Sequence, residues 1–161
     1  MDYGFSVSFR AALKVCPALS GDHEHGFYVN LDPKQTKECY EADNLTTRIM
    51  GIWADSNVDS LSRPEDLLLD HCEKKSAGNK RREALTIRLL AFRGHRSVSC
   101  ERALGDSIIE VVVVTQAGKS PVGKIASINY VATLRTTVDK IDKDLGHFVS
   151  MVKSVRFNNP G

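Results

Sequence analysis

The β-branched run Ser107–Thr115, with the turn and the second run that follow it, constrains the fold more than any other feature. The first run reads SIIEVVVVT, and the turn Gln116–Lys124 contains two glycines and a proline. Ile125–Arg135 then alternates apolar and polar side chains, as a strand with one buried face does. A nine-residue connection without a helix is too short for a parallel crossover, so the two runs should form an antiparallel hairpin.

An amphipathic helix should follow this hairpin. The spacing of the apolar residues predicts a helix over Thr137–Lys153 that lays one stripe on the sheet. Thr136 and Asp139 fit the pattern of an N-terminal cap, and Lys153–Phe157 alternates enough to predict a short edge strand. The residues of the stripe are Val138, Ile141, Leu145, Phe148, Val149 and Val152.

Shorter alternating runs earlier in the chain predict further strands. Val15–Pro17 interrupts this pattern, and Gly51 is placed where a β-bulge would fit. A helix is expected over Arg63–Lys75. The predicted strands are Tyr3–Phe9, Phe27–Leu31, Thr46–Ala54, Leu85–Phe92 and the stretch Gly94–Cys100.

These elements predict the α+β class. Strands and helices are interspersed without the regular alternation that implies a parallel sheet. We therefore expect an antiparallel sheet of five to seven strands with two main helices packed on it. A chain of 161 residues fits a single domain, residues 1–161.

Charge and hydropathy exclude some classes of partner. Twenty-two basic against twenty acidic residues leave a net charge of +2, which does not favour nucleic acid. No apolar run approaches the roughly 18 residues of a membrane span. We expect neither nucleic acid nor a membrane span, and the sequence does not indicate an oligomeric state.

Four cysteines without a CxxC pair fit two disulfides better than a zinc cluster. We predict that Cys16 pairs with Cys39 and Cys72 with Cys100, because each pair closes a local loop with little regular structure. The alternative is four unpaired, partly buried thiols. Disulfides indicate an oxidising compartment such as a bacterial periplasm, in which case a signal peptide has been removed.

Asp22–His25, which reads DHEH, is the most reactive-looking stretch. If it is extended, His23 and His25 project to the same face and could share a metal with Asp22 or Glu38. Two ligands are not a site, so we favour a polar turn and predict no metal and no cofactor. No cysteine or serine has a family signature around it, so we predict no catalytic residue.

The opening pattern of Tyr3–Phe9, a central helix and a close containing INYVATLRTT and DLGHFVSMVKSVRF resemble the PsbP-like α+β domains. The resemblance implies an antiparallel sheet covered by helices, with a strand, a helix and a short strand at the C-terminus. It also implies a mainly non-enzymatic scaffold. In build, the chain is similar to type VI secretion immunity proteins, which are small, secreted and often disulfide-bearing.

We therefore expect a secreted, non-enzymatic protein that binds a protein partner, as an immunity-type inhibitor of a toxic effector enzyme in the periplasm. Polar loops at the ends of a sheet carry recognition in such proteins. Trp53 is either a core residue beside Ile49 or an exposed anchor at a strand end. The alternatives are a periplasmic accessory or small-ligand or metal-binding protein, and an unrecognised hydrolase. The expected contact residues are Asp22, His23, Glu24, His25, Trp53 and Asp55.

Overall fold

The computed structural model describes residues 4–9, 13–17, 25–32, 48–56, 63–66, 68, 95, 97–117 and 128–157. The strands within these ranges are β1 (Phe5–Ser6), β2 (Val15–Pro17), β3 (Gly26–Asn30), β4 (Ile49–Ser56), β5 (Ser97–Leu104), β6 (Ile108–Ala117), β7 (Ile128–Thr137) and β8 (Arg156–Phe157). A 3-10 turn, η4 (Val138–Lys140), leads into helix α3 (Ile141–Ser154).

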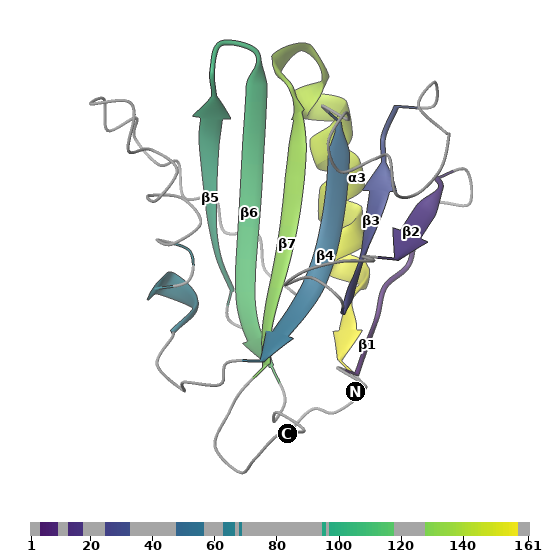
Figure 1. Ribbon diagram of the computed structural model, residues 1–161, viewed down its shortest axis with the longest axis vertical. Helices are drawn as coiled ribbons and strands as arrows, with labels where there is room; N and C mark the ends of the chain where they lie inside the picture. Colours follow the sequence, from purple (N-terminus) through teal and green to yellow (C-terminus); the bar gives the residue numbers. More distant parts are fainter. Residues whose placement is uncertain are drawn as a thin grey trace.

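Six of the strands form one sheet in the order β2, β3, β4, β7, β6, β5, and β1 pairs with β8 in a smaller second sheet (Figure 1). Every neighbouring pair is antiparallel. The expected hairpin of β6 and β7 is confirmed, and its register runs from Ile108 opposite Thr137 to Ala117 opposite Ile128. The predicted antiparallel sheet and the short terminal strand β8 are therefore both present.

Two local predictions about the first half of the sheet are wrong. Val15–Pro17 does not interrupt the strand pattern but forms β2, in which Cys16 is buried between two exposed neighbours. Gly51 is not in a bulge, since it lies in continuous register opposite Tyr28 and Thr133. A Cβ atom at Gly51 would lie 3.1 Å from the carbonyl oxygen of Phe27, so a larger residue at this position would push slightly on β3.

The final helix also begins differently from the prediction. The α-helical turns start at Ile141, after η4, and no side chain caps either segment. Thr136 stays in β7, buried, and donates its hydroxyl to Oδ2 of Asp144 at 2.5 Å. Of the predicted helix Arg63–Lys75, residues 64–66 and 68 are helical and the remainder lies outside the described residues, as does the predicted strand Leu85–Phe92.

α3 covers one face of the six-stranded sheet, here called the helix face (Figure 1). Phe5, Val7 and Phe9 pack against the same core, as their alternation predicts. Leu68 packs on the other face, here called the opposite face, where it meets Val112 among others. The helix-face core consists of Val29, Leu31, Met50, Ile52, Val111, Val113, Ala132, Leu134, Phe148, Met151, Val152 and Val155.

A buried ion pair fixes α3 to the sheet. Arg48, just before β4, donates from Nε at 2.8 Å and from Nη2 at 2.6 Å to the two carboxylate oxygens of Asp144. The Asp144 side chain is fully buried, and 14% of the Arg48 side chain is exposed. Arg48 and Thr136 together donate three hydrogen bonds to the Asp144 carboxylate. These bonds connect the first turn of α3 to β7 and to the residue before β4.

Candidate functional site

The structure brings together three of the residues that the sequence predicted as partner contacts. Trp53 lies opposite Gly26 in the register of β3 and β4. The amide of Ala54 donates to the carbonyl oxygen of His25 at 3.1 Å, and Asp55 follows directly on the same strand. His25, Trp53 and Asp55 therefore share one corner of the sheet, here called the far-end corner. Asp22, His23 and Glu24 lie outside the described residues.

Gly26 makes this close arrangement sterically possible. A Cβ atom at this position would lie 2.4 Å from the carbonyl oxygen of Ile52 and 2.6 Å from Cβ of Trp53. Real Cβ atoms do not approach backbone atoms so closely, so only glycine fits without moving β4. The sequence did not single out Gly26 for this role, although a glycine at the start of a strand is a usable signal.

Trp53 combines the two alternatives that the sequence left open. Its ring is partly buried and packs against the apolar cluster of the opposite face, which includes Leu68 and Val131. Ile49 lies on the same face, but it packs with Cys16 and Tyr28 in a separate cluster. Trp53 therefore packs on the core of the opposite face while part of its side chain stays exposed, and it lies three residues before the end of β4.

An aromatic cluster lies on the helix face near the far-end corner. The ring of Phe5 meets Phe27 at 5.8 Å and Tyr130 at 5.5 Å, both edge-on. The ring of Phe157 lies 4.3 Å from Tyr130 and 4.7 Å from His95. These contacts hold β1 and β8 against the sheet, so they stiffen the backbone beside the far-end corner.

A second charged cluster crosses the opposite face at the other end of the sheet. Glu110 lies between Arg102 and Arg135 in the register of β5, β6 and β7. Arg102 donates to one carboxylate oxygen of Glu110, and Arg135 donates to the other at 3.2 Å. Burial lowers the pKa of Arg102, and the nearby charge of Arg135 lowers it further.

Two of the four cysteines, Cys16 and Cys100, lie in described strands. Cys16 and Cys100 are each disulfide-bonded and 2% exposed. They lie in the two edge strands, five strand spacings or roughly 24 Å apart, whereas bonded cysteines have Cα atoms within about 7 Å. They therefore do not bond to each other. Because Cys39 and Cys72 lie outside the described residues, the predicted pairing of Cys16 with Cys39 and of Cys72 with Cys100 stays a prediction.

Within the described ranges, no group of three or more His, Cys, Asp or Glu side chains could hold a metal ion. His23 lies outside those ranges, so a metal shared by His23 and His25 is not tested. No helix in the described part of the chain is long and apolar enough to cross a membrane. No protein-family model matches the sequence, and comparison with curated proteins gives no match.

Proposed function

We propose that this protein is a secreted, non-enzymatic protein that binds a toxic effector enzyme and inhibits it in a bacterial periplasm, as immunity proteins do. The observation that carries the proposal is the far-end corner, where the backbone of His25, just before β3, pairs with β4 beside Trp53 and Asp55. The indole of Trp53 and the imidazole of His25, which are both partly exposed, suit recognition of a protein surface. Tryptophan is among the residues that most often dominate such interfaces.

The scaffold behind this corner supports an inhibitory role. Trp53 is held by the opposite-face core, and the pairing of Gly26 with Trp53 leaves no room for an added Cβ atom. Binding through a preformed surface costs little conformational entropy, so a small contact area can give high affinity. We also propose that the protein is of the type VI secretion immunity class and that its fold is PsbP-like.

The test begins with capture of the partner. The tagged chain is used to pull down proteins from the native cell, and effector candidates encoded beside its gene are co-expressed with it. We expect a secreted enzyme to be caught and its activity to fall when the protein is added at equimolar concentration. Turnover of a substrate by the purified protein, with no protein caught, would contradict the proposal.

Substitutions at the far-end corner then locate the contact. His25→Ala and Asp55→Ala should each weaken binding, and Trp53→Ala should weaken it by about 2 kcal/mol or roughly 30-fold. Val138→Ala is the matched control, because Val138 is 54% exposed and lies in η4, near the other end of the sheet. Melting temperatures separate lost contact from lost folding. Equal weakening by the control would place the contact elsewhere.

A further inference from the structure

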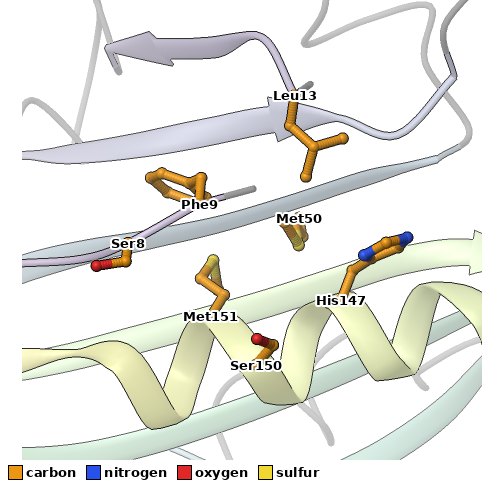
Figure 2. A pocket seen from close by; sticks show the side chains of 7 residues that line it. All are labelled: Ser8, Phe9, Leu13, Met50, His147, Ser150 and Met151. Atoms are coloured by element: carbon orange, nitrogen blue, oxygen red, sulfur yellow. The ribbon is translucent and has the colours of Figure 1, made fainter. Parts of the chain in front are cut away.

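A small pocket opens between β4 and α3 on the helix face (Figure 2). Its volume is about 10 Å³, roughly the room that a single water-sized particle requires. Here it is called the methionine pocket, because two thioether side chains form its floor. The residues that line it are Ser8, Phe9, Leu13, Met50, His147, Ser150 and Met151.

The donor atoms of the methionine pocket come from both layers of the fold. Met50 reaches from β4 toward α3, and Met151 and His147 rise from α3 toward it (Figure 2). His147 and Met151 are four residues apart, so the helix presents them on the same side. The chain has three methionines, and the two besides Met1 both line this pocket.

The surroundings hold these side chains in place. Met50 and Met151 are each 1% exposed, and both belong to the helix-face core. The hydroxyl of Ser154 donates to the carbonyl oxygen of Ser8 at 3.1 Å and accepts from its amide at 2.9 Å, which fixes the outer wall against α3. Donors on a rigid helix and a rigid strand form a preorganised set.

We propose that the methionine pocket binds one soft monovalent cation, Cu(I), through the sulfur atoms of Met50 and Met151 and an imidazole nitrogen of His147. Thioether and imidazole donors select Cu(I), whereas Ca²⁺ and Mg²⁺ require oxygen donors. The two thioether sulfur atoms carry no charge, and the apolar side chains of Phe9 and Leu13 complete the wall. Such a lining suits a cation that carries a single positive charge.

Methionine also fills irregular gaps in cores without binding anything. The observation that favours a site is that both sulfur-bearing side chains and an imidazole line one space that remains open. Disulfide bonding of Cys16 and Cys100 removes two thiols that would otherwise compete for the ion. The inference is independent of the proposed inhibitory function, since the far-end corner contributes no residue to this pocket.

The three methionines make a direct test possible. In protein labelled with ¹³C at the methionine methyl groups, each methionine gives one NMR signal, and Met50→Leu and Met151→Leu assign two of them. One equivalent of Ag⁺, a stable analogue of Cu(I), should shift the signals of Met50 and Met151 and leave that of Met1 in place. Unchanged signals, or a shift of Met1 as well, would overturn the proposal.

Affinity for Cu(I) gives the second test, measured without oxygen against a coloured chelator in protein shown to have no free thiol. The Met50→Leu/Met151→Leu variant and His147→Gln should each lose at least the roughly 10- to 100-fold that a disturbed metal site loses. Leucine nearly matches methionine in volume, and His147 is only partly buried, so both variants should fold. Lys153→Ala, at an exposed position of α3 outside the pocket lining, should bind as the parent does. Equal affinity in all variants would place the ion elsewhere and overturn the proposal.

Discussion

The two ends of the six-stranded sheet contain opposite kinds of chemistry. One end of the sheet is where β5 turns into β6 at Gly105, and it is here called the hairpin end; the connection between β6 and β7 lies at the other end. The hairpin end has a charged cluster on each face: Arg48 with Asp144, and Glu110 between Arg102 and Arg135. The far end has Trp53 and the aromatic cluster instead. Figure 1 shows the hairpin end at the top and the far end at the bottom.

We infer that the charged end of the sheet stabilises the fold and that the aromatic end is suited to contact with a partner. Buried charges are stable only while every partner is present, so the hairpin end tolerates little change. Aromatic side chains tolerate partial exposure and can exchange protein neighbours for those of a partner. We therefore expect substitutions at the hairpin end to act mainly on unfolding, and those at the far-end corner to act mainly on binding.

The largest effect is expected at Asp144. Asp144→Ala leaves the mostly buried guanidinium of Arg48 without its carboxylate, and Thr136 without its acceptor. Removing one member of a buried pair costs about 3 to 5 kcal/mol in the free energy of unfolding. Urea unfolding measures it, with Asp142→Ala, at an exposed position in the same turn, as the control. A loss below about 1 kcal/mol would show that the pair does not fix α3.

Glu110 should follow, with a loss of about 3 kcal/mol for Glu110→Ala. The substitution leaves two guanidinium groups facing each other, but 36% of the Arg135 side chain is exposed and can turn toward water. The matched control is Glu101→Ala on the neighbouring strand β5, where the carboxylate is only partly buried. If both variants unfold at the same urea concentration, the ion pairs of Glu110 with Arg102 and Arg135 do not add to the stability of the fold.

The sequence predicted the strands of the sheet better than it predicted the charged clusters. A β-branched run locates β6, and alternation locates β7 because a half-buried strand imposes a period of two on its residues. The row of Arg102, Glu110 and Arg135 depends on the register between three strands, and that is not encoded in any one of them.

The candidate site, too, could be predicted only in part from the sequence. The sequence singled out His25 and Trp53, but only the pairing of β3 with β4 places them at one corner. Val138 was counted in the apolar stripe of the final helix, yet it is 54% exposed because η4 winds more tightly than an α-helix and changes its direction. The methionine pocket had no local signal, since Met50 and Met151 are about a hundred residues apart in the sequence.

Two glycine substitutions should differ in sign and sharpen the contrast within the fold. Gly26→Ala places a methyl group against the backbone of β4 and should cost about 2 kcal/mol, as overpacking does. Gly146→Ala meets no atom within 4 Å on the exposed side of α3 and should stabilise the protein by about 0.5 to 1 kcal/mol. Thermal melts of both variants check this. A stabilised Gly26→Ala variant would contradict the close packing at the far-end corner.

Acid should also weaken the fold, through Asp144. Burial alone would raise the pKa of Asp144, but the hydrogen bonds from Arg48 and Thr136 outweigh it and leave this pKa below its usual value. A carboxyl whose pKa is lower in the folded state stabilises the fold above its unfolded pKa, near 4, and loses this contribution as the pH falls through the folded value. Between pH 5 and pH 3 the parent should therefore lose stability on the order of 1 kcal/mol more than Asp144→Asn does. Urea unfolding of both proteins at these two pH values measures the difference, and parallel losses would mean that other carboxylates, at either end of the sheet, govern the response to acid.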